Sequence, residues 1–139
     1  MLENLLAAVV YLGVGVALLI LAAFVVDLLT PGRLVSHVVD QRSYSAALVL
    51  AAALLGQGLV IFTAIWTNAD AGFGDALLWT VAFGLLGVVL SAVAFLLIDL
   101  LTPGRLGQML SRPGPVQPIA VVTAAAHLAV AAIVVASIA

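Results

Sequence analysis

Four long apolar stretches, separated by short polar connections, make up most of the chain. They cover roughly residues 5–26, 46–66, 76–98 and 119–138. A helix needs about 20 mostly apolar residues to cross about 30 Å of hydrocarbon, and each stretch has that length. Membrane β-strands would instead alternate polar and apolar residues over about ten positions, which these stretches do not do. The pattern therefore predicts an all-α membrane protein with four transmembrane helices.

The polar connections between these stretches differ in composition and in charge. Segment 67–75 is short and rich in Gly, Asn and Asp, which predicts a tight turn between antiparallel helices. Segment 111–118 holds three of the five prolines and is expected to be irregular. Basic residues lie only in the first and third connections, which the positive-inside rule places in the cytoplasm, with both termini outside. These basic residues are Arg33, Arg42, Arg105 and Arg112.

The octapeptide DLLTPGRL occurs twice, at residues 27–34 and 99–106. The shift of 72 residues between the copies also aligns much of the apolar stretch that precedes each of them. Each repeated unit then contains two spans, so that both units enter the membrane in the same sense. The sequence thus predicts two tandem, parallel-oriented two-helix repeats, at residues 1–70 and 71–139.

The octapeptide also predicts a bend at the membrane surface. Proline disfavours helix at the preceding threonine, so the first helix of each unit should end there. Because Thr-Pro favours a helix start, short amphipathic helices are expected at the interface, at residues 31–40 and 103–112. The motif residues are Asp27, Thr30, Pro31, Gly32 and Arg33 in the first copy, and Asp99, Thr102, Pro103, Gly104 and Arg105 in the second.

The two aspartates of the motif have two possible roles. As anchors, they would reach interfacial water or pair with Arg33 and Arg105, and so fix the depth of each helix. As pathway groups, Asp27 and Asp99 would flank an internal axis that conducts a cation or a proton. An aspartate costs roughly 3 kcal/mol at the bilayer centre and less at the boundary, where these two are expected, so anchoring is favoured.

Gln57 and His127 are the polar residues nearest the middle of the predicted spans. The 72-residue shift places His127 opposite Leu55, at a similar depth to Gln57 on the equivalent helix. Polar side chains in a span should face the bundle interior and find hydrogen-bonding partners. One hypothesis is a small polar site in which His127 changes protonation. The simpler one is interhelical hydrogen bonding, worth about 0.6 kcal/mol on average.

Small residues and tryptophans indicate how the helices pack and where they meet the interface. Trp66 and Trp79 flank the second connection, as expected of interfacial anchors. Small residues allow close helix contacts, which favours packing over a wide pore. The small residues considered are Gly13, Gly15, Gly56, Gly58, Gly84, Gly87, Ser91 and Thr123.

Composition strengthens the membrane assignment and excludes several functions. The chain is 66% hydrophobic and 7% charged, whereas an average soluble domain is roughly 25% charged. A net charge of −2 without a basic patch argues against binding nucleic acid. With no cysteine, thiolate metal sites and cysteine nucleophiles are excluded. No catalytic, phosphate-binding or metal-binding motif is present, so we expect no enzyme activity, no cofactor and no metal.

Two segments carry a family resemblance: DLLTPGRL in both copies, and SAALVLAAALLGQGLVIFTAIW at residues 45–66. Together they resemble the bacterial membrane family catalogued as domain of unknown function 350, over essentially the whole chain. The resemblance implies a multi-pass protein of the bacterial inner membrane, built of two tandem two-helix units. Family members tend to have an acidic–Asn–x–Ala-like stretch before the second helix of a unit. This chain has QRSYSAAL (41–48) and RPGPVQPIA (112–120) there.

The sequence leaves two main functions open. The favoured one is a non-catalytic protein that acts through helix association in the bilayer, as a homo-oligomer or as a small subunit of a larger envelope complex. The alternative is a small ion, proton or solute transporter or channel subunit. In that case Asp27, Asp99, Gln57 and His127 would line the path. A membrane enzyme is a distant third, since only His37, His127 and the aspartates could transfer protons.

Overall fold

The structure, a computed structural model, describes residues 1–29, 43–101, 113–116 and 118–139. Each predicted span lies inside an observed helix that is long and apolar enough to cross a membrane. For the described residues, the predicted all-helical fold with four helices able to span a membrane is therefore confirmed. The helices are α1 (Leu2–Leu29), α3 (Tyr44–Thr67), α4 (Phe73–Leu101) and α6 (Pro118–Ile138).

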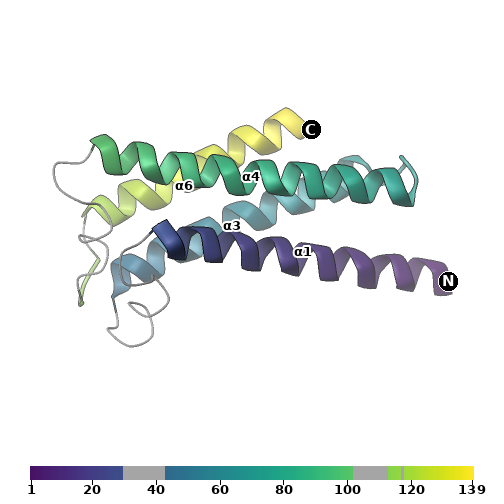
Figure 1. Ribbon diagram of the computed structural model, residues 1–139, viewed down its shortest axis with the longest axis horizontal. Helices are drawn as coiled ribbons and strands as arrows, with labels where there is room; N and C mark the ends of the chain where they lie inside the picture. The colour runs from purple at the N-terminus through teal and green to yellow at the C-terminus, as the bar shows by residue number, and fades with distance from the viewer. Residues whose placement is uncertain (30–42, 102–112, 117) are drawn as a thin grey trace.

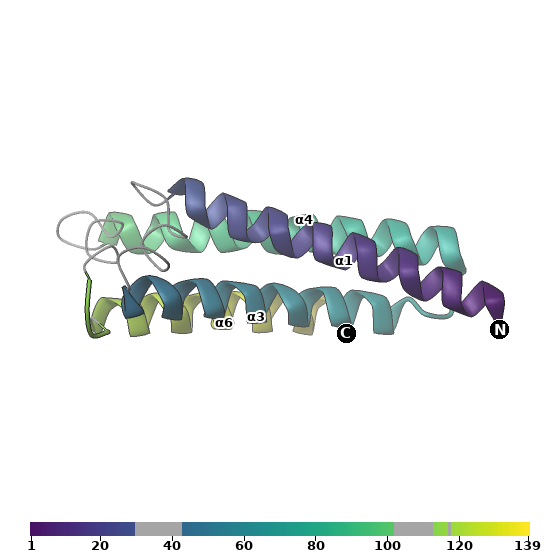
Figure 2. The same cartoon turned by 90° about the horizontal axis from the view of Figure 1, so that it is seen from below.

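The four helices form two layers, with α1 beside α4 in one and α3 beside α6 in the other (Figure 2). Helices α1 and α4 run in one direction, and α3 and α6 run in the opposite direction (Figure 1). The most extensive contact is between α3 and α6. Helix α1 packs against α4 and α3, and both of these contacts are much smaller. The outer helix α1 is consequently the least buried of the four.

The predicted tight turn joins α3 to α4, and its polar residues explain its shape. Asn68 follows α3, and its side-chain Nδ2 donates to the Ala64 carbonyl at 2.9 Å, which satisfies a carbonyl at the helix end. Gly72 has φ of +87°, a conformation that glycine adopts without steric cost. The Gly72 carbonyl then accepts from Ala76 N at 2.9 Å as α4 begins.

The segment that precedes α6 is attached to the start of α3. Tyr44 N donates to the Gly114 carbonyl at 3.2 Å, and Ser43 and Gly114 form an isolated parallel bridge. Gly114 has φ of +101°, so this contact requires a residue without a Cβ. Ser43 also caps α3, because its side chain accepts from Ala46 N at 3.3 Å. The described part of the predicted irregular segment thus has a definite position on α3.

In each octapeptide, only the aspartate and the two leucines that directly follow it are described. Asp27 is buried in the last turn of α1, with 3% of its surface exposed, and Asp99 is half-buried in the last turn of α4. The interfacial helices predicted at 31–40 and 103–112 lie outside the described residues. So do the remaining motif residues: Thr30, Pro31, Gly32, Arg33, Thr102, Pro103, Gly104 and Arg105.

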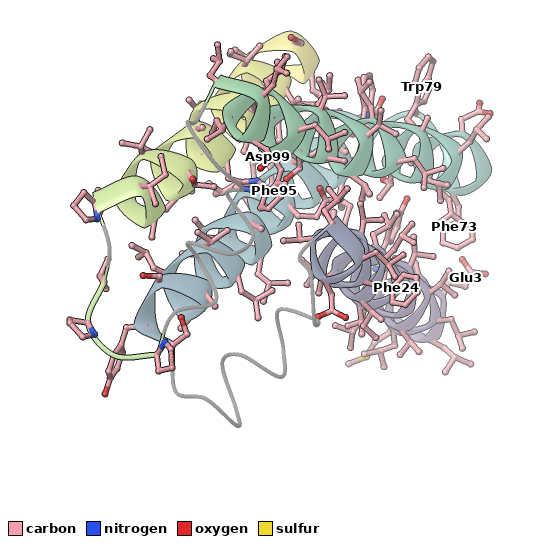
Figure 3. The ribbon with its side chains drawn as sticks, turned by 60° about the vertical axis from the view of Figure 1, so that its left-hand side comes forward. Glu3, Phe24, Phe73, Trp79, Phe95 and Asp99 are labelled. Carbon is pink, nitrogen blue, oxygen red and sulfur yellow. The ribbon has the colours of Figure 1, made fainter. Side chains whose placement is uncertain are left out.

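The core contains few large side chains. Phe95 of α4 is the largest fully buried side chain among the described residues, and it packs against Val49 of α3 and Ala120 of α6. Trp66 and Trp79 are exposed, and Figure 3 shows Trp79 pointing away from the bundle. Bulky side chains therefore lie mostly on the lipid-facing surface, while small ones fill the interior.

Candidate intramembrane polar site

Three helices each contribute a polar side chain to one small cavity. Gln57 comes from α3, Ser91 from α4 and His127 from α6. Gln57 and His127 are 4% and 2% exposed, and Ser91 is half-buried. The cavity has a volume of about 10 Å³, close to the smallest space that holds one water molecule. The two polar residues singled out in the sequence thus lie at the same place in the structure.

Glycines of α4 make room for the Gln57 side chain. Gln57 Nε2 donates to the Gly84 carbonyl at 2.8 Å, which ties α3 to α4 inside the bundle. Gln57 Oε1 lies against Gly87, where an added Cβ would come within 2.7 Å of that oxygen. A side chain at position 87 would therefore require the carboxamide of Gln57 to shift from this position.

His127 is held from α4 by Ser91. The Ser91 Oγ and His127 Nδ1 atoms are 2.6 Å apart, which is a short hydrogen bond. The Phe95 ring, one turn further along α4, packs with its centroid 6.4 Å from that of the imidazole. The other ring nitrogen, Nε2, has no hydrogen-bond partner among the described residues. The role of Ser91 could not be predicted, because nothing in its spacing connects it to a histidine 36 positions away.

The small residues considered in the sequence fall into two groups. A Cβ on Gly56 would lie 2.9 Å from the Ala131 Cβ, so Gly56 permits the close contact between α3 and α6. A Cβ on Gly13 or Gly58 would meet nothing within 4 Å. Composition alone cannot separate the glycines at helix contacts from those on the outer surface.

The buried positions of α3 match those of α6 when the two helices are aligned with a shift of 74 residues, and not with the shift of 72 that separates the two octapeptides. Leu55, which the 72-residue shift places opposite His127, is 65% exposed. At the spacing of 74, His127 corresponds to Ala53 and Gln57 corresponds to Ala131. Gln57 and His127 therefore reach the cavity from non-equivalent positions. The matching buried pairs are Ala46 and Ala120, Val49 and Thr123, Ala53 and His127, Gln57 and Ala131, and Val60 and Val134.

The two aspartates do not line the cavity. None of its lining residues belongs to α1, which carries Asp27. Asp99 lies eight residues beyond Ser91, about 12 Å along α4. The described part of the chain also holds no group of three histidine or acidic side chains that could bind a metal ion. The cavity thus brings together the hydrogen-bonding side chains of Gln57, Ser91 and His127.

Comparison with known proteins identifies the family. The family model described as Domain of Unknown Function (DUF350) matches residues 1–138. A UPF0719 transmembrane protein of Mycolicibacterium paratuberculosis is 37% identical over 112 residues, which cover 81% of this chain and 74% of that protein. A UPF0719 transmembrane protein of Mycobacterium bovis is 30% identical over 137 residues, which cover 99% of this chain and 89% of that protein. No solved structure matches. The chain therefore belongs to the DUF350 family of membrane proteins.

Proposed function

We propose that the protein is a non-catalytic module of the bacterial inner membrane that acts by helix association, first of all with further copies of itself. The exposure of α1 carries this proposal. In the most apolar 18-residue segment of α1, only 17% is buried within the chain, against 44% in that of α3. A helix so weakly packed gains most from a neighbour in the membrane, where association depends on close packing rather than on escape from water.

A groove between α1 and α3 can accommodate a helix of another protein molecule. It has a volume of about 270 Å³ and is lined by Tyr11 and Gly15 of α1 and by Gly58, Ile61 and Phe62 of α3, among others. Because an added Cβ on Gly58 would meet nothing within 4 Å, another backbone can approach closely at this point. The same groove could receive a helix of a larger envelope complex, in which this chain would be a small subunit.

Filling the groove should prevent self-association. We expect Gly58→Leu to shift the protein from oligomers towards monomers, since the new side chain occupies the space that a partner helix would use. Subunit counting by single-molecule photobleaching in lipid nanodiscs measures this shift. Gly13→Leu is the matched control, because Gly13 is equally open but does not line the groove. Wild-type protein that is purely monomeric and purifies without a partner would refute the proposal.

The charge distribution supports a defined orientation, with the first and third connections in the cytoplasm and both termini outside. The natural chain has no cysteine, so single cysteines report sidedness cleanly. In intact spheroplasts we expect a membrane-impermeant maleimide to label Ala71→Cys, in the α3–α4 turn, and not Val116→Cys, just before α6. Val116→Cys should react once the membrane is permeabilised. The opposite labelling pattern would reverse the proposed orientation.

The arrangement of the helices also supports duplication of a two-helix unit, with residues 1–70 and 71–139 as its copies. The first helices of the two units, α1 and α4, run parallel, as do the second helices, α3 and α6 (Figure 1). The change in spacing from 72 to 74 residues then means that the connection of the second unit is two residues longer.

A transport function makes a different prediction. A proton or cation path through one copy would need the aspartates and the polar site to share a hydrated route. The cavity at Gln57 and His127 has room for about one water molecule, and neither aspartate lines it. We therefore expect no protein-dependent proton flux into proteoliposomes, and no change from the double variant Asp27→Asn with Asp99→Asn. Flux that the double variant abolishes would establish the transport alternative.

A further inference from the structure

The buried imidazole of His127 has one satisfied and one unsatisfied nitrogen. Nδ1 is bonded to Ser91 Oγ at 2.6 Å. Nε2 is buried and has no partner among the described residues, and the ring lines the cavity beside Gln57. Buried polar atoms in native proteins nearly always have a partner, and an internal water molecule supplies it where no side chain does. The cavity is therefore a candidate site for a ligand of the size of water.

The hydrogen bond between Ser91 and His127 is the basis for assigning the nitrogen that carries the proton. Other hydroxyls inside the spans donate to the carbonyl four residues earlier, as Thr80 does to Ala76 and Thr123 to Ile119. Within the described residues the Ser91 hydroxyl bonds only to His127 Nδ1. Because no other acceptor for this hydroxyl is found among the described residues, Ser91 is assigned as the donor and Nδ1 as the acceptor. A neutral imidazole that accepts at Nδ1 carries its hydrogen on Nε2.

An acceptor stands on the wall of the same cavity. Gln57 donates through Nε2 to Gly84, which fixes the carboxamide and leaves Oε1 against Gly87. Both Gln57 and Gly87 line the cavity together with His127. A water molecule between them would find a donor, the His127 Nε2–H, and an acceptor, Gln57 Oε1. Two such partners are what an internal water molecule needs.

We propose that this cavity binds a single water molecule, which accepts a hydrogen bond from His127 Nε2–H and donates one to Gln57 Oε1. The water joins α3 to α6, as Gln57 joins α3 to α4 and Ser91 joins α4 to α6. The N–H group of His127 and the small volume of the cavity favour water over a cation, because an N–H group offers a cation no lone pair. The proposal is independent of whether the protein self-associates.

Solid-state NMR of the full chain in lipid bilayers, labelled with ¹⁵N at histidine and tryptophan, tests the site. The chain has two histidines, and the His127 signals are assigned by comparison with His37→Gln. We expect a neutral His127 ring with a pyrrole-type Nε2 and a pyridine-type Nδ1. We also expect transfer of magnetisation from water to Nε2–H. A proton on Nδ1, a doubly protonated ring, or an Nε2–H without water transfer would each overturn the proposal.

Variants separate the roles of the three side chains. Gln57→Leu should abolish the water transfer and leave the proton on Nε2, while unchanged Trp66 and Trp79 indole signals show that the fold is intact. Ser91→Ala removes the donor to Nδ1 and should populate the second tautomer. Ser137→Ala is its control, because Ser137 donates only to Ile133 on the exposed side of α6 and should leave the His127 spectrum unchanged. Water transfer that persists fully in Gln57→Leu would contradict the assigned acceptor.

Discussion

Phe95→Ala is expected to lower the free energy of unfolding by about 2 kcal/mol. In soluble cores this change costs roughly 3–5 kcal/mol, because it removes buried apolar surface and leaves a cavity. In a bilayer the unfolded reference state keeps the ring in apolar lipid, so little of the transfer contribution remains. The cavity contribution stays, since Phe95 is 2% exposed between Val49 and Ala120, out of reach of lipid chains. Unfolding in mixed detergent and lipid micelles measures the loss.

Phe24→Ala is the matched control for Phe95→Ala. Phe24 lies on α1 and is 47% exposed, so lipid chains can fill the space that its ring leaves (Figure 3). We expect a change within about 0.5 kcal/mol, the usual range for surface substitutions. Equal losses for the two variants would contradict the packing described for α4.

Gly56→Ala is expected to destabilise the protein by about 1–2 kcal/mol, through the contact between α3 and α6. The new Cβ would lie 2.9 Å from the Ala131 Cβ, which is fixed to the α6 backbone and cannot rotate away. The helices must then move apart, and overpacking of this kind typically costs 1–3 kcal/mol. Part of this cost is offset, because alanine favours helix over glycine by roughly 0.5–1 kcal/mol.

Gly58→Ala isolates that steric cost. It makes the same chemical change two residues along α3 and gains the same helix propensity, but its Cβ meets nothing within 4 Å. In the monomer, where no partner helix packs against Gly58, we expect Gly58→Ala to be neutral or slightly stabilising, so that the two variants differ by about 1–3 kcal/mol. Similar unfolding free energies for both would show that α3 and α6 do not approach as closely as the structure has them.

The helices could be predicted from the sequence because lipid imposes a simple rule. A segment of about 20 apolar residues has no alternative to a helix in hydrocarbon, and all four predicted spans lie within observed helices. The turn between α3 and α4 was equally predictable, because Asn68 is of a type that ends helices and Gly72 of a type that allows a turn with positive φ. What hydropathy does not encode is the direction in which each helix faces, since the spans are apolar on all sides.

The polar site was predictable only in part for the same reason. Gln57 and His127 stand out in apolar surroundings, and burial of such residues follows from the cost of exposing them to lipid. Ser91 does not stand out, because a serine can satisfy its hydroxyl on its own helix, as Ser137 does. Likewise, Gly56 and Gly58 are indistinguishable in sequence, and only the position of α6 shows which one is at a contact.

The close pairing of α3 with α6 has a consequence for biogenesis. When the first three helices have entered the membrane, the face of α3 around Gly56 still lacks its partner, and it acquires one only when α6 follows. The bond from Tyr44 to Gly114 likewise forms only after the last connection is made. Insertion of the first two helices therefore cannot complete their packing, which is finished only when the last helix is in place.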